Sequence, residues 1–303
     1  TIHNFKSDHV SRYLEGYYTS SLIQKISKIF KINPNRIILY FGIEDFIRNL
    51  FSELDPQKDS ILTNEKCFGY FEIFAQFKNL KLHLFNLDRN DDSFIFNIKD
   101  CIQKIKKHKP KVVIITTPNN PTGNKINFSD LEKIIRHTPK SSLFLVDETY
   151  CGFFPGYEEK KFRQFINRYP NIIFLRTFSK FYGLAGLRVG FGFCGQDFKK
   201  MIGYQNRFLN FSRILEESAI AALDSKDFYK KTAKKICADR DWLVREINQL
   251  KNFHAYESFG SFIYVATSPR YFTRLEKEQK NKPVIIWKKL DQKSFRISIN
   301  QTK

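Results

Sequence analysis

The stretch TFSKFYGLAGLRVGFGF, from Thr177 to Phe193, follows an apolar run and combines a lysine, two hydroxyl side chains, glycines and an arginine. A buried strand would not contain Lys180 or Arg188, and a solvated loop would not contain so many aromatic residues. A lysine forms a Schiff base with a carbonyl compound when burial or a nearby cation activates it. Lys180 is therefore a candidate catalytic lysine beside an anion site, although a lone lysine at a strand end also fits a plain surface position.

Apolar strands alternate with amphipathic helices before and through this stretch. Helical spacing marks residues 20–30, 44–54, 69–80, 98–109 and 129–138, and apolar runs mark strands at 37–41, 59–64, 80–87, 111–117, 142–147 and 171–177. Because several strands are apolar throughout, we expect an α/β fold with a mostly parallel sheet covered on both faces.

The last third of the chain has a different pattern. A long helical region at 214–250 precedes two probable strands, 261–267 and 294–300. We therefore expect three parts: an N-terminal arm and helix at 1–30, a large domain at 31–207 and a smaller α+β domain at 208–303.

The composition excludes some classes of protein. The 303 residues include 51 basic and 31 acidic ones, for a formal net charge of +20. The basic residues form short clusters without a helix-turn-helix, zinc-finger or RNP pattern, so a non-catalytic nucleic-acid-binding protein is only a third alternative. Without a long apolar run or a signal-peptide core we expect no membrane partner and a cytoplasmic location. Five scattered cysteines indicate reduced thiols rather than disulfides or a metal site.

Polar residues follow three other predicted strands. Asp147 ends one strand and Tyr150 lies three residues on, Asn120 lies in the turn TTPNNPTG, and Gly42 begins a helix. Ligands of such sheets bind outside the carboxyl ends of the strands, where these residues would converge. Each also has a plain structural explanation, as a helix cap or a turn residue.

The set GIED, PNNPTG, VDETY, TFSKFYGLAGLRVGF and FRIS, in this order, resembles the fold-type-I pyridoxal-phosphate enzymes. Among these it is most similar to the class II aminotransferases of the histidinol-phosphate aminotransferase group. The resemblance extends from about residue 12 to residue 300, and its most specific part is Ser-Lys followed by GLAGLR.

The resemblance implies a covalent cofactor, pyridoxal 5'-phosphate. Lys180 would hold it as a Schiff base and then move the substrate proton, and Asp147 would pair with the ring nitrogen. Tyr150 and Asn120 would hydrogen-bond the ring's phenolic oxygen, and Phe68 would stack on the ring.

The family also implies a phosphate site, a substrate site and a homodimer. The cofactor phosphate would be held by the backbone N–H groups of Ile43 and Glu44 and by the side chains of Thr177, Ser179 and Arg188. Arg296 would bind the α-carboxylate of an amino-acid substrate, and Asn120 would be a second substrate-binding residue. Tyr13 resembles the tyrosine that reaches the cofactor phosphate of the neighbouring subunit.

Three features depart from the family pattern. Gly-Ile-Glu-Asp replaces the usual Gly-Ser/Ala-Asp-Glu, which leaves the backbone donors unchanged. Trp287, followed by Lys288 and Lys289, stands where relatives often carry an arginine for a substrate phosphate, which leaves open a substrate other than histidinol phosphate. A preceding segment and a last helix of the family are not in the sequence, either truncated or absent.

We therefore expect an aminotransferase that uses glutamate or a similar donor and a small anionic keto or amino compound, with or without a phosphate group. A decarboxylase similar to threonine-phosphate decarboxylase is the alternative, because it would use the same Lys180 and Asp147. Tyr150 favours transamination, since relatives of the decarboxylase tend to have phenylalanine there.

Overall fold

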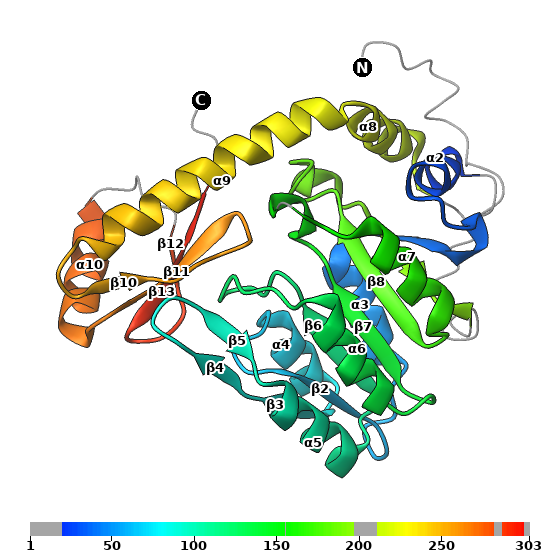
Figure 1. Ribbon diagram of the computed structural model, residues 1–303, viewed down its shortest axis with the longest axis horizontal. Helices are drawn as coiled ribbons and strands as arrows, with labels where there is room; N and C mark the ends of the chain where they lie inside the picture. Colours follow the sequence, from blue (N-terminus) through cyan, green and yellow to red (C-terminus); the bar gives the residue numbers. More distant parts are fainter. Residues whose placement is uncertain (1–19, 155, 197–210, 282–286, 300–303) are drawn as a thin grey trace.

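The computed structural model describes residues 20–154, 156–196, 211–281 and 287–299. Its centre is a seven-stranded sheet (Figure 1). In spatial order its strands are β1 (Ile37–Tyr40), β9 (Gly190–Cys194), β8 (Ile172–Thr177), β7 (Leu143–Asp147), β6 (Val112–Thr116), β2 (Ser60–Asn64) and β3 (Lys81–Phe85). Only β9 runs against the others. The predicted mostly parallel sheet is thus confirmed, and β9 is a strand that the sequence pattern does not predict.

Helices cover both faces of this sheet. They are α2 (Ser21–Phe30), α3 (Gly42–Ser52), α4 (Tyr70–Phe77), α5 (Ile98–His108), α6 (Phe128–His137) and α7 (Glu159–Arg168). Successive strand residues point to opposite faces, so Val113 and Ile115 share a core with α2, α5, α6 and α7, whereas Val112 and Ile114 share one with α3 and α4. Among the described residues, no helix is both long and apolar enough to cross a membrane.

A second, four-stranded sheet lies beside the first (Figure 1). Its strands are β10 (Phe253–Ala255), β11 (Phe262–Thr267), β13 (Ser294–Ser298) and β12 (Trp287–Lys289). Helices α8 (Arg213–Asp224), α9 (Lys226–Asn248) and α10 (Pro269–Asn281) accompany it, and β4 (Leu87–Arg89) and β5 (Phe94–Phe96) form a separate hairpin. The division of the chain at residues 30/31 and 207/208 stays a prediction.

The turn after β6 connects the two sheets. The N–H of Phe259 donates to the carbonyl of Gly123 over 2.8 Å. Gly123 has a φ of +81°, and a Cβ there would lie 2.4 Å from the Oγ of Ser258. Glycine is therefore needed both for the backbone conformation and for the close approach of the second sheet.

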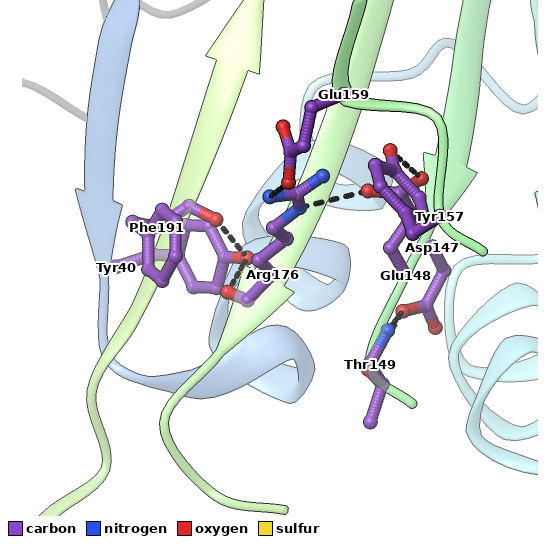
Figure 2. A network of polar contacts seen from close by, with 8 residues as sticks. All are labelled: Tyr40, Asp147, Glu148, Thr149, Tyr157, Glu159, Arg176 and Phe191. Atoms are coloured by element: carbon purple, nitrogen blue, oxygen red, sulfur yellow. Dashed lines mark hydrogen bonds and ion pairs between the residues drawn. The ribbon is translucent and has the colours of Figure 1, made fainter. Parts of the chain in front are cut away.

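A tyrosine and a glycine fix the edge of the main sheet. Tyr40 pairs with Gly190 across β1 and β9. The single proton of its hydroxyl is shared between the carbonyl oxygens of Arg176 (2.7 Å) and Phe191 (2.9 Å), which Figure 2 draws beside it. A Cβ on Gly190 would lie 2.1 Å from the tyrosine ring. The ring thus occupies the space that any larger residue at this position would need.

We expect Gly190→Ala to lower the free energy of unfolding by about 1–3 kcal/mol, because the added methyl group overpacks the core against Tyr40. Urea unfolding at neutral pH measures the change. Gly186→Ala is the matched control, since Gly186 is exposed and a Cβ there meets no atom within 4 Å. An equal loss in both variants would contradict this role of the contact.

Candidate active site

One cavity of about 440 Å³ gathers the predicted site residues. It lies at the carboxyl ends of β1, β6, β7 and β8 and is closed on one side by β12 and β13. Its lining includes Ile43, Glu44, Phe68, Asn120, Asp147, Tyr150, Thr177, Ser179, Lys180, Arg188 and Arg296. Tyr13 lies outside the described residues.

Lys180 follows the end of β8 and lines this cavity. Burial lowers the pKa of its ammonium group, and the cations Arg296 and Arg188 lower it further, against the opposing effect of Asp147. Its Nζ lies 5.7 Å from the centre of the Tyr150 ring. A lowered pKa raises the neutral fraction of the amine, which is the form that attacks a carbonyl carbon.

Asp147 ends β7 with only 3% of its surface exposed. Its Oδ1 accepts the N–H of Thr149 over 3.0 Å and the hydroxyl of Thr149 over 2.6 Å (Figure 2). Burial raises the pKa of the carboxyl to about 6, although the Thr149 hydrogen bonds and Lys180 favour its charged form. The sequence analysis missed Thr149, whose spacing from Asp147 is typical of an Asx turn.

Asn120 and Arg296 bring the two sheets together inside the cavity. Nη1 of Arg296 donates to Oδ1 of Asn120 over 2.8 Å, and the guanidinium lies 5.3 Å from the ring centre of Phe262. Phe262 in turn packs edge-on against Tyr150, with ring centres 4.8 Å apart. Burial raises the pKa of the Tyr150 hydroxyl to about 12, against the opposing effect of Arg296, so that this hydroxyl stays protonated as a donor at neutral pH.

The start of α3 and Arg188 form a corner suited to an anion. The residue before α3, Phe41, supplies no side-chain cap to its first turn, and backbone N–H groups at a helix start attract negative charge. A Cβ on Gly42 would lie 2.4 Å from Nη2 of Arg188, so glycine leaves room for the guanidinium. On the adjacent strand end, the N–H of Ser179 donates to Oγ1 of Thr177 over 3.0 Å, and their hydroxyl oxygens lie 2.9 Å apart.

The cavity is rich in positive charge and has unpaired polar atoms. Lys180, Arg188, Lys289 and Arg296 line it, against Glu44 and Asp147. Within the described part of the chain, Thr116 Oγ1 and Arg296 Nε are buried without a hydrogen-bond partner. Residues 20–154, 156–196, 211–281 and 287–299 contain no cluster of three or more His, Cys, Asp or Glu that could hold a metal ion. The arrangement suits an anionic organic ligand whose polar groups pair with these atoms.

The structure describes part of the segment near residue 287, where the sequence departs from the family pattern. Trp287–Lys289 form β12, and Lys289 lines the cavity while its Nζ lies 2.8 Å from Oε1 of Glu276. The side chains of Trp287 and Lys288 lie outside the described residues. Lys289 is therefore a cation that the structure brings to this end of the cavity.

Comparisons with known proteins agree with this geometry. The sequence matches the family of class I and II aminotransferases over residues 3–301. Histidinol-phosphate aminotransferase of Methanocaldococcus jannaschii is 29% identical over 248 residues, which cover 80% of this chain but 64% of that enzyme, or slightly less than two thirds of its length.

Two solved structures share the fold. Histidinol-phosphate aminotransferase of Sinorhizobium meliloti in complex with pyridoxal-5'-phosphate has a TM-score of 0.83 at 20% identity, covering 97% of this chain and 79% of that one. L-threonine-O-3-phosphate decarboxylase of Porphyromonas gingivalis has a TM-score of 0.75 at 17% identity, covering 97% and 89%. The predicted fold class is confirmed by these likenesses.

The buried carboxyl of Asp147 should give the ligand-free protein a specific pH dependence. Its pKa is raised from 3.8 to about 6 on folding, so the folded state binds the extra proton and the free energy of unfolding falls as pH rises from about 4 to above 6. Asp147→Asn keeps an acceptor for Thr149 but has no charge. We expect it to be more stable than wild type by about 2–3 kcal/mol at pH 8 and equally stable near pH 4.

Urea unfolding of the ligand-free protein across this pH range measures the difference. Asp239→Asn, an exposed position on α9, is the control and should follow the wild-type curve. A constant offset between Asp147→Asn and wild type at every pH would show that the carboxyl is not buried with a raised pKa.

Proposed function

The chain belongs to the family of class I and II aminotransferases, and we propose that it moves an amino group between an amino acid such as glutamate and a small anionic, phosphorylated keto or amino compound. The observation that carries the proposal is the convergence of Lys180, Asp147 and Arg296 on one cavity. Lys180 follows β8, whereas Asp147 and Arg296 belong to β7 and β13. The fold alone does not require these three side chains to face a common space.

The residues of the cavity fit pyridoxal 5'-phosphate, the cofactor of this family. The start of α3, Thr177, Ser179 and Arg188 would hold its phosphate. Asp147 would hold the proton on the ring nitrogen, and Phe68 would pack against the ring. The raised pKa of Asp147 describes the ligand-free protein, and a cationic ring nitrogen would favour its charged form.

The bound cofactor supplies a conjugated ring that takes up the electrons left when a bond at the substrate α-carbon breaks. Lys180 would bind the cofactor covalently through Nζ and, once released, move the proton at that α-carbon. Burial and two neighbouring arginines favour the neutral amine that both tasks need.

Asn120 has a defined orientation for its role. Because its Oδ1 accepts from Arg296, its Nδ2 is directed to donate, which suits the phenolic oxygen of the ring. The hydroxyl of Tyr150, protonated at neutral pH, would be a second donor to the same oxygen. Nε of Arg296 has no hydrogen-bond partner among the described residues, and Nη2 makes one long contact, 3.5 Å, to Oγ of Ser298. These two groups would bind the substrate carboxylate as a two-pronged partner.

The phosphorylated substrate is part of the proposal and rests on the curated relatives and on the surplus of positive charge in the cavity. A homodimer and a cytoplasmic location are also proposed. The dimer follows from the resemblance at Tyr13 and the location from the biosynthetic role of the relatives' reaction.

The absorbance spectrum of the purified protein with pyridoxal phosphate tests the reaction. We expect glutamate to convert the visible band into a near-ultraviolet band, because the amino group passes to the cofactor. Lys180→Ala is the control: it should lack the yellow species that borohydride reduces onto the protein. A visible band unchanged by glutamate would contradict glutamate as donor and favour the decarboxylase or another donor, whereas a reducible yellow adduct in Lys180→Ala would overturn the role of Lys180.

We expect Arg296→Ala to weaken glutamate binding by about 2–3 kcal/mol, or roughly 30- to 150-fold, because a charge-assisted pair to the carboxylate is lost. Cofactor affinity should change no more than about threefold, since phosphate and ring contacts lie elsewhere. Spectral titrations with each ligand measure both constants. Equal losses of glutamate and cofactor affinity would indicate that Arg296 is structural.

A further inference from the structure

A second cavity, of about 630 Å³, lies behind the catalytic strand ends. It is bounded by α2, α9 and the segment after β7, and it shares only Thr149 and Thr177 with the first cavity. Its volume falls within the range of about 300–1,000 Å³ in which small-molecule sites occur. The proposed transamination uses no group that lines it except these two threonines.

The walls of this cavity are mainly aromatic. Its rings are Phe30, Phe153, Phe154, Tyr157, Phe181, Tyr182 and Phe191. Five of them, those of Phe30, Phe154, Tyr157, Phe181 and Tyr182, are partly exposed to solvent. A flat apolar body placed between them would remove this surface from water.

Positive charge gathers on one side of the cavity. Lys226, Lys230 and Lys234 lie four residues apart on α9, so all three occupy one face of the helix, and all three line the cavity. With the residues that the structure describes, none of them forms an ion pair or a side-chain hydrogen bond.

The charged groups of the opposite wall form a network of their own, made of one guanidinium and two carboxylates. Nε of Arg176 donates to Glu148 over 2.8 Å, Glu148 accepts the hydroxyl of Tyr157, and Glu159 lies 3.6 Å from Nη1 of Arg176 (Figure 2). The guanidinium is also enclosed by aromatic rings, with the ring centre of Phe162 at 4.5 Å. Nη2 of Arg176 is buried without a hydrogen-bond partner among the described residues, but the carboxylates of Glu148 and Glu159 outnumber this one positive charge. An anionic group would therefore be attracted more strongly to the three lysines of α9 than to this wall.

We propose that this cavity binds a small organic anion with a flat aromatic body. The rings hold the body, and Lys226, Lys230 and Lys234 hold the anionic group at the opening. The inference does not depend on the reaction proposed for the first cavity, because it uses different contacts and predicts binding to the cofactor-loaded protein.

Anilinonaphthalene sulfonate, an aromatic anion, is the probe, and calorimetric titration of the cofactor-loaded protein is the measurement. We expect one site per chain. Lys230→Glu/Lys234→Glu should weaken binding at least about tenfold, because two attractive charges become repulsive. Lys231→Glu/Lys235→Glu is the matched control: it makes the same charge change on α9 at residues that do not line the cavity, and it should stay within about threefold of wild type.

Two further measurements separate this cavity from general surface attraction. Ala233→Trp places an indole inside the cavity from a buried position and should abolish binding, while an unchanged cofactor spectrum verifies the fold. Phenylnaphthylamine, which has the same rings without the sulfonate, should bind with an affinity that Lys230→Glu/Lys234→Glu does not change. Absence of binding at millimolar probe, equal losses in the two double variants, or full binding in Ala233→Trp would each overturn the proposal.

Discussion

Parallel pairing of β7 and β8 is the constraint from which both cavities follow. This pairing brings Asp147 and Thr177 together at the carboxyl ends of the two strands, with both side chains on one face of the sheet. The side chains of the residues adjacent to them in sequence, Glu148 and Arg176, point to the opposite face. On that other face Glu148 and Arg176 form an ion pair that is almost fully buried. Removing one partner of such a pair costs about 3–5 kcal/mol, because the other charge is left uncompensated. The pair therefore holds together the two strand ends on whose opposite face the catalytic groups lie.

The first cavity is lined by residues of both sheets. Arg296 belongs to β13 and reaches Asn120 on the turn after β6, while Gly123 on that turn contacts the loop before β11. Arg296 and Arg188 both lower the pKa of the Lys180 ammonium in addition to the effect of burial. The chemistry of Lys180 thus depends in part on Arg296, a residue that lies in the second sheet and much later in the chain.

Sequence patterns predicted the sheet, its covering helices and the residues at the strand ends, because each depends on local periodicity and on the rule that parallel strands end at one edge. They did not predict β9, whose alternating glycines lack a strand signal, or the Thr149 contact to Asp147. The burial of Arg176 depends on Glu148, Glu159 and rings as distant as Phe30, and no local pattern contains that information. The second cavity was missed for the same reason.

Helix α9 is a single element of 23 residues, about 34 Å long. One end borders the aromatic cavity, and the other packs on the second sheet through Ile247 and its neighbours. This one continuous helix thus contacts two different parts of the molecule, one at each end. A tilt of α9 as a rigid body would therefore change the wall of the aromatic cavity and the contact with the sheet that carries Arg296 at the same time.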